Sequence, residues 1–252
     1  MNAIEPLELD FSVRGFDCGY GGAYRPLALA NMLQEAASVH ADKLGWGAAA
    51  MGALNRTWML SRIDLRLEAE PKEGETLIVR TWPAGFEKLF ALRDFEVESR
   101  DTKAVVARAS YAYLVVDLAA RRPIRAQNAI DPKLICGRPR SLADARYSCA
   151  KPGDSAAWKE RCSLIAMDRH IDHNGHVNNA HLIAWLCDAP PADERAAGRL
   201  AALRVEFAQE ALLDDSLTLA WAPLAPDGAA ASQACELRRG TDVCARAEIA
   251  WR

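Results

Sequence analysis

The chain has 252 residues, of which 50% are hydrophobic and 26% are charged. This length is enough for one large domain or two ordinary ones with a real hydrophobic core, and the balance excludes a disordered or fibrous chain. The formal net charge of −3 is too small to coat a nucleic acid by electrostatics alone. We therefore expect no nucleic-acid partner, and an anionic partner would have to meet a local basic patch.

Seven cysteines are scattered along the chain, and no two of them form a Cys-x-x-Cys pair. Such usage is typical of free thiols in a reducing compartment, so we predict the cytoplasm. The first ten residues hold three acids and lack the apolar core of a secretory signal. No apolar run approaches the length of a membrane span, and we expect no membrane association.

The first half predicts one helix followed by strands. Residues 11–17 are a short strand candidate, and Pro26 then begins an apolar stripe at helical spacing that ends at Gly45. Alternating or β-rich segments come next, separated by turns at 72–74, at Pro83-Ala84-Gly85 and at 100–101. These four strand candidates lie at 63–68, 76–82, 88–98 and 104–116.

The second half repeats this order. Residues 117–158 have little periodicity and predict a connection, after which a strand at 161–167 precedes a helix at about 177–188. Further strand candidates lie at 203–208, 217–221, 232–238 and 243–251. The repeat predicts an α+β chain with two similar halves at 1–135 and 159–252, joined by a linker at 136–158.

Four of the five histidines lie between residues 170 and 181. Asn174-Gly175 favours a turn and the apolar spacing resumes at Val177, so this cluster lies where a loop enters a helix. Free backbone N–H groups and the positive end of the helix dipole gather there. The segment is therefore a candidate site for an anion or an oxyanion.

Two other interpretations of the cluster were weighed. Asp168, His173 and His181 taken singly are more often capping or solvated residues. A metal site could use His170, His173 and His176 with Asp172, which would suit a metal-dependent hydrolase. The Asn-Gly turn interrupts the helix that would align these histidines, and no HExxH motif is present. We therefore predict no metal and no cofactor.

The segment 172–179, followed by Trp185, resembles the Asp-x-Asn-x-His-Val-Asn-Asn-x-x-Tyr-x-x-Trp signature of acyl-acyl carrier protein thioesterases. Matches in the first half follow the same family in order and spacing. The resemblance covers nearly the whole chain and implies a tandem, or double, hot-dog fold, in which a long helix is wrapped by a curved antiparallel sheet in each half. It also implies hydrolysis of fatty acyl thioesters on acyl carrier protein. These first-half matches lie at 33–40, 44–45, 57–62, 74–76 and 81–82.

One position departs from the plant members of that family, which carry a Glu-Cys pair in the second half. The matching residues here are Glu210 and Ala211, so a thiol nucleophile is impossible at this position. By the resemblance, the catalytic residues are Asp172, Asn174, His176 and Glu210.

The roles of these residues follow from thioester chemistry, in which a water must be activated and a carbonyl polarised. We expect Glu210 to act as the general base or, alternatively, as a nucleophile. His176 and Asn174 would position water and thioester, and Asp172 would orient His176 or the loop. The backbone N–H of Val177 is the expected oxyanion donor.

The resemblance also suggests where substrate and partner bind. The acyl chain would lie along the first helix, with Leu29, Met32, Leu33 and Trp58 as substrate-binding residues, although such a stripe is more often plain core. Acyl carrier proteins are acidic, so basic groups at Arg121, Arg122 and Arg125, or at Arg138 and Arg140, are candidates for docking. Two copies of the chain could also form a homodimer.

Three alternative functions remain open at this stage. The chain could be a non-hydrolytic dehydratase acting on acyl thioesters, an acyl-binding module, or a thioesterase that prefers acyl-coenzyme A.

Overall fold

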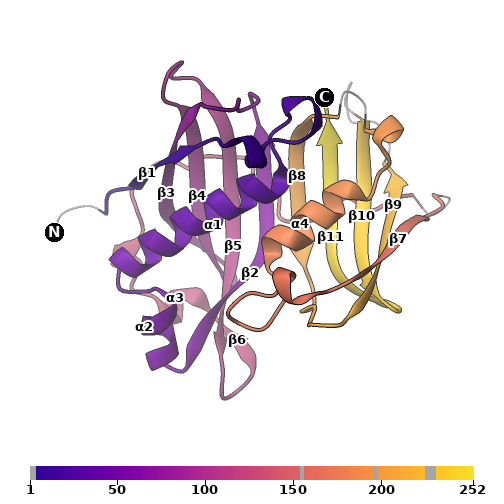
Figure 1. The fold of residues 1–252 in the computed structure, drawn as a ribbon. Helices are drawn as coiled ribbons and strands as arrows, with labels where there is room; N and C mark the ends of the chain where they lie inside the picture. Colours follow the sequence, from indigo (N-terminus) through magenta and orange to yellow (C-terminus); the bar gives the residue numbers. More distant parts are fainter. Residues whose placement is uncertain (1–3, 154–155, 196–197, 225–230) are drawn as a thin grey trace.

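The computed structural model describes residues 4–153, 156–195, 198–224 and 231–252 (Figure 1). The first half begins with strand β1 (Leu7–Ser12), helix α1 (Pro26–Lys43) and the short helix α2 (Ala48–Ala53). Long strands follow, and the half ends with the short strand β6 (Arg122–Ile124) and the single turn α3 (Ala126–Ala129). The long strands are β2 (Arg56–Leu67), β3 (Thr76–Glu87), β4 (Phe90–Ser99) and β5 (Val105–Asp117).

The second half repeats this order on a smaller scale. Strand β7 (Lys159–Ile165) leads through a loop to helix α4 (Asn179–Asp188), and an antiparallel set of strands closes the chain. These strands are β8 (Leu200–Phe207), β9 (Ser216–Pro223), β10 (Ala231–Arg239) and β11 (Asp242–Trp251). Within the described residues each half is thus a long helix against an antiparallel sheet, as the sequence predicts.

The two halves share one sheet. Among the described strands the order is β1-β3-β4-β5-β2-β8-β11-β10-β9-β7, with β6 attached to β5. The junction is the antiparallel pair β2 and β8, in which Ile63 faces Val205 and Leu65 faces Leu203. Joining the sheets in this way removes one open edge from each half.

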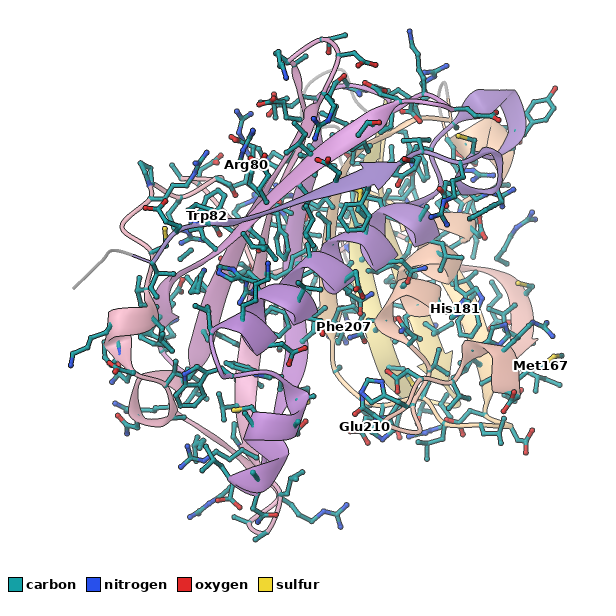
Figure 2. All side chains as sticks on the ribbon, turned by 60° about the vertical axis from the view of Figure 1, so that its left-hand side comes forward. Arg80, Trp82, Met167, His181, Phe207 and Glu210 are labelled. Atoms are coloured by element: carbon teal, nitrogen blue, oxygen red, sulfur yellow. The ribbon has the colours of Figure 1, made fainter. Side chains whose placement is uncertain are left out.

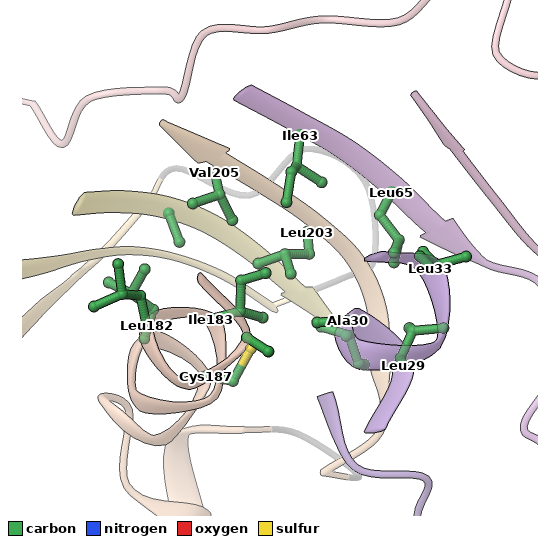
Figure 3. Close-up of a cluster of buried hydrophobic side chains, with 14 of the residues drawn as sticks. Leu29, Ala30, Leu33, Ile63, Leu65, Leu182, Ile183, Cys187, Leu203 and Val205 are labelled. Atoms are coloured by element: carbon green, nitrogen blue, oxygen red, sulfur yellow. The ribbon is translucent and has the colours of Figure 1, made fainter. Parts of the chain in front are cut away.

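Helices α1 and α4 lie side by side across the same face of this sheet (Figure 1). Figure 3 shows the core at the junction, where Leu29 and Leu33 of α1 and Ile183 of α4 lie against the apolar face of β2 and β8. Leu33 is 0% exposed and packs in the same core cluster as Leu65. Burial of side chains of this size contributes about 1.5–3 kcal/mol each, so the shared core holds the two halves together.

Residues 140–149 of the connection lie against the face of the sheet opposite the core, where they contact carboxylates of the strands. Arg140 donates through Nε to the buried Asp94 on β4 at 2.8 Å, and the backbone N–H of Arg146 donates to Asp64 on β2 at 2.8 Å. Further along, the N–H of Cys149 donates to Glu206 on β8 at 2.7 Å. The segment therefore bridges strands of both halves. The exact domain boundaries predicted from sequence stay predictions.

Several sequence predictions of elements were wrong at their edges. The first strand is Leu7–Ser12, whereas 15–17 form a 3₁₀ turn. Strand β3 runs through the expected turn at Pro83-Ala84-Gly85 to Glu87, because a register shift between Pro83 and Gly85 absorbs the irregularity. Helix α2 was not expected, and α4 begins at Asn179 rather than Val177.

Candidate active site

The loop before α4 is a small, tightly bonded hairpin. The N–H of Gly175 donates to the carbonyl of Asp172 at 3.0 Å, and the N–H of Asp172 donates to the carbonyl of His176 at 2.8 Å. Gly175 has a φ of +81°, the left-handed conformation that completes a three-residue hairpin loop and that a side chain would strain. The turn at Gly175 therefore fixes the direction of its neighbours Asn174 and His176.

Asp172 supports this loop from within. Its Oδ1 accepts a hydrogen bond from the N–H of Asn174 at 2.8 Å. This is the local bond by which a short acidic side chain stabilises a turn. Of the two predicted roles for Asp172, the geometry favours orientation of the loop.

Helix α4 starts directly after the loop with a side-chain cap. Asn178 Oδ1 accepts from the N–H of Ala180 at 2.8 Å, which satisfies one of the free donors of the first turn. Gln34 Nε2 of α1 lies 3.5 Å from the same Asn178 oxygen. The loop is thus connected to the long helix of the first half.

A second segment, after β8, lies against the loop. The N–H of Val177 donates to the carbonyl of Ala211 at 2.8 Å. His176 and Leu212 form an isolated antiparallel β-bridge. Asp215 Oδ2 holds the segment by accepting from the N–H of Leu212 and from Arg239 Nη1, each at 2.8 Å. This pairing brings Glu210 beside His176.

Glu210 Oε2 lies 3.2 Å from His176 Nε2. The side chains are 62% and 36% exposed, respectively, so water can reach both. Figure 2 shows Glu210 on the side of the molecule that carries α4 and its labelled residue His181. The four predicted catalytic residues therefore lie on two adjacent, hydrogen-bonded segments.

A cavity of about 980 Å³ opens beside the loop. Asp172, His173 and Asn174 line it, whereas neither His176 nor Glu210 does. Its other walls come from one side of α1, from strands of the first half and from the loops at 44–47 and 130–135. The volume is at the upper end of the range for small-molecule sites. Lining residues from these walls include Met32, Ala41, Leu44, Trp46, Trp58, Phe86, Leu92, Tyr113 and Ile130.

The four predicted substrate-binding residues divide into two pairs. Met32 and Trp58 line the cavity, and Trp58 is held in place because its Nε1 donates to the carbonyl of Trp46 at 2.7 Å. The prediction for Leu29 and Leu33 was wrong. Both face the sheet in the core of Figure 3 and do not line the cavity, because they lie on another side of α1.

The prediction that Val177 supplies an oxyanion donor is also wrong in this structure. Its N–H is already bound to the Ala211 carbonyl, and Val177 is buried. A donor engaged in a backbone hydrogen bond is not available to a developing negative charge. Asn174 lines the cavity, and its side-chain amide has no hydrogen-bond partner within the described residues, so it is a better candidate donor.

Two of the other histidines, His170 and His181, pack against Trp185. The ring centroids of His170 and Trp185 are 4.9 Å apart, and those of His170 and His181 are 5.0 Å apart. Burial lowers the pKa of both histidines below the ordinary value, which favours their neutral form. In the part of the chain that the structure describes, no three His, Cys, Asp or Glu residues are grouped as metal ligands, so His170, His173 and His176 are not brought together.

Sequence reasoning missed one polar group inside the cavity, Arg93 of β4. Phe95 and Val97 on the same strand are fully buried, and side chains two apart share a face of a strand. The alternation therefore placed Arg93 inward, although its charge favoured an outward position.

The fold and the paired segments define a double hot-dog protein in which a polar loop lines a cavity with both polar and apolar walls. The family model for the acyl-ACP thioesterase N-terminal domain matches residues 7–132, and that for the C-terminal domain matches residues 164–252. The chain belongs to the acyl-ACP thioesterase family.

Relatives and solved structures agree with this assignment. The chain is 27% identical over 218 residues to a chloroplastic palmitoyl-acyl carrier protein thioesterase of Gossypium hirsutum, covering 82% of this chain and 52% of the relative. It thus spans about half the length of such curated relatives. The structure matches an acyl-ACP thioesterase from Bacteroides thetaiotaomicron with a TM-score of 0.85, at 24% identity and 98% coverage of each chain. It also matches the 12:0-ACP thioesterase from Umbellularia californica with a TM-score of 0.83, at 21% identity, covering 98% of this chain and 94% of that one. These likenesses confirm the double hot-dog fold.

Proposed function

We propose that the protein hydrolyses fatty acyl thioesters of acyl carrier protein, releasing a free fatty acid and the carrier thiol. The observation that supports this most is the 3.2 Å contact between Glu210 and His176, the latter on a loop whose Asn174 lines the cavity. The Glu210 carboxylate can act as a base and the His176 imidazole as a second proton carrier. The Asn174 amide can donate a hydrogen bond to the thioester carbonyl.

In the proposed reaction, a water molecule is held between Glu210 and His176. The water oxygen attacks the carbonyl carbon of the thioester while the Glu210 carboxylate takes up a proton from the water. The Asn174 amide donates to the carbonyl oxygen while charge develops on it. The carbon–sulfur bond then breaks, and the leaving thiolate takes up the proton. Because a thiolate leaves readily, no strong acid is required. Asp172 keeps Asn174 in position through its backbone hydrogen bond.

Acyl carrier protein is the proposed partner, and a basic surface would attract it. Arg138 and Arg140 are poor candidates, because each is paired with a carboxylate, Glu96 and Asp94 respectively. Arg121, Arg122 and Arg125 are exposed and make no ion pair within the described residues. We therefore propose that the carrier docks on Arg121, Arg122 and Arg125.

The compartment and the oligomeric state stay predictions. All seven cysteines are free, in keeping with the proposed reducing cytoplasm. No helix in the described ranges is long and apolar enough to cross a membrane.

The test is incubation of the purified protein with a panel of acyl thioesters on acyl carrier protein and on coenzyme A, following free thiol and acyl products. We expect thiol and free acid in equal amounts, with a higher kcat/KM on the protein carrier. An enoyl thioester without thiol release would instead identify a dehydratase. Binding without any turnover would identify an acyl-binding module, and preference for coenzyme A would reassign the carrier.

A further inference from the structure

Arg93 places a positive charge in the wall of the acyl cavity. It lies on β4 and lines the cavity together with Tyr113, Trp58 and Phe86. Its neighbour Asp94 points to the other face of the sheet, where it pairs with Arg140. The cation is therefore separated from the carboxylate next to it in sequence.

Arg93 forms no ion pair with any residue the structure describes. Its two polar contacts both use Nη1, which donates to His40 Nδ1 at 3.1 Å and to Thr81 Oγ1 at 3.3 Å. Burial, with the charges of Arg93 and Lys43, lowers the pKa of His40 to about 4, so His40 is neutral at pH 7 and offers a lone pair. Both acceptors are thus uncharged.

The other side of the guanidinium is free. The N–H groups on Arg93 Nε and Nη2 have no protein acceptor within the described ranges, and neither nitrogen is among the buried atoms sealed without a partner. Both nitrogens therefore keep accessible surface on a side chain that lines the cavity. Burial lowers the pKa of Arg93 only to about 10, so the group keeps its charge at pH 7.

An apolar chain end in contact with the Arg93 guanidinium would displace water from it. The N–H groups of the cation would then lose hydrogen bonds that nothing replaces, which is unfavourable. An oxygen on the chain would replace that water. The Nε and Nη2 edge presents two parallel donors, a geometry suited to a carboxylate and also able to bind a carbonyl or hydroxyl oxygen. The cavity wall thus distinguishes chains by chemistry as well as by length.

We propose that the cavity selects acyl chains that carry an oxygen, as a hydroxyl, keto or carboxylate group, at the carbon that reaches Arg93. This inference rests on the proposed function, because it assumes that the cavity holds an acyl chain. Tyr113 lines the same cavity close enough to Arg93 for their charges to interact, so we expect its hydroxyl to act on the same oxygen. Burial raises the pKa of Tyr113 to about 12, which keeps that hydroxyl a donor.

The competing interpretation is structural. In that case Arg93 serves only to tie His40 of α1 to β4, water occupies its free edge, and the acyl chain ends before reaching it. The two interpretations differ in substrate preference. A structural Arg93 gives no advantage to an oxygenated chain of any length.

The test compares acyl carrier protein thioesters in a chain-length series, each as the unsubstituted, ω-hydroxy and ω-carboxy form. We expect the wild-type kcat/KM to be about tenfold or more higher for an oxygenated chain at the length that reaches Arg93. Arg93→Met should reverse this preference, and Arg93→Lys should keep part of it. Preference for the unsubstituted chain at every length in the wild type would overturn the proposal.

A binding measurement separates this inference from the proposed function and needs no turnover. Calorimetry on the wild type should give a lower Kd for an α,ω-dicarboxylic acid than for the monocarboxylic acid of equal length, at one length in the series. Equal or weaker binding of the diacid throughout would overturn the inference. Absence of thiol release from every thioester would instead overturn the proposed function, while the acid comparison would still decide the role of Arg93. Because both comparisons use the wild type, they hold even if Arg93→Met does not fold.

Discussion

His176 Nε2 and Glu210 Oε2 lie 3.2 Å apart, although they belong to segments on either side of α4 and β8. The backbone bonds from Val177 to Ala211 and the bridge from His176 to Leu212 hold the two segments together. The contact is therefore fixed by the fold, whereas the two side chains stay accessible to water.

Glu210→Gln tests the proposed base. We expect kcat to fall by roughly 100- to 10,000-fold, because an amide cannot accept the proton from water. The Tm should stay within a few degrees, since the side chain is largely exposed. Glu160→Gln, a change of the same kind at an exposed residue of β7, is the matched control. Near-wild-type turnover by Glu210→Gln would remove Glu210 from the reaction.

Alkylation of thiols should spare activity. Ala211 occupies the position where plant relatives have a cysteine, and burial raises the pKa of Cys149 to about 12. Burial also raises the pKa of Cys187 and Cys235, so these thiols resist iodoacetamide as well. Mass spectrometry should find label on the exposed Cys162 with turnover retained. Complete inactivation from which substrate protects would contradict the absence of a catalytic thiol.

Met32 and Leu33 are neighbours on α1 with different expected effects. Leu33→Ala should lower the free energy of unfolding by about 2–5 kcal/mol, because it leaves a void in the core shared by the two halves. Met32→Ala enlarges the cavity and should shift the preferred acyl length toward longer chains. Urea unfolding and a chain-length series measured on folded protein separate the two effects. A shift in chain length for Leu33→Ala alone would contradict the assignment of walls.

The difference between these neighbours also shows what the sequence could predict. Helical spacing identified α1 and α4, and alternation identified most strands, because burial of one face imposes those periods. The Asn174-Gly175 turn and the motif around His176 located the loop. Periodicity does not specify which side of a buried helix faces a cavity, so Leu29 and Leu33 were placed wrongly.

Other features depend on contacts between distant segments, which no local pattern encodes. The pairing of β2 with β8, which makes one sheet of two, joins strands from opposite halves. The Val177 N–H is bound by the carbonyl of Ala211, which is distant in the sequence. Arg93 followed the inward alternation of β4 against its own polarity, and its acceptors His40 and Thr81 come from other elements.

The pH dependence of stability should report on His40. Burial is the main cause that lowers its pKa from 6.5 to about 4, so between these values the folded state binds fewer protons than the unfolded state. The contribution to stability is therefore complete above pH 6.5 and is lost as pH falls toward 4, by roughly 3 kcal/mol. Urea unfolding of wild type and His40→Gln from pH 7 to 4 should give a shallower decline for the variant. Parallel declines would contradict a buried neutral His40.

If the loop at 172–176 and Glu210 act as one catalytic unit, a double-mutant cycle will show it. The measured quantity is kcat/KM for one fatty acyl thioester of acyl carrier protein, with His176→Ala, Glu210→Gln and the double variant. Residues that act as a unit give strongly non-additive effects. We predict that the double variant loses little more activity than the more damaged single variant. Losses that multiply fully would mean that His176 and Glu210 act independently, which would contradict the account.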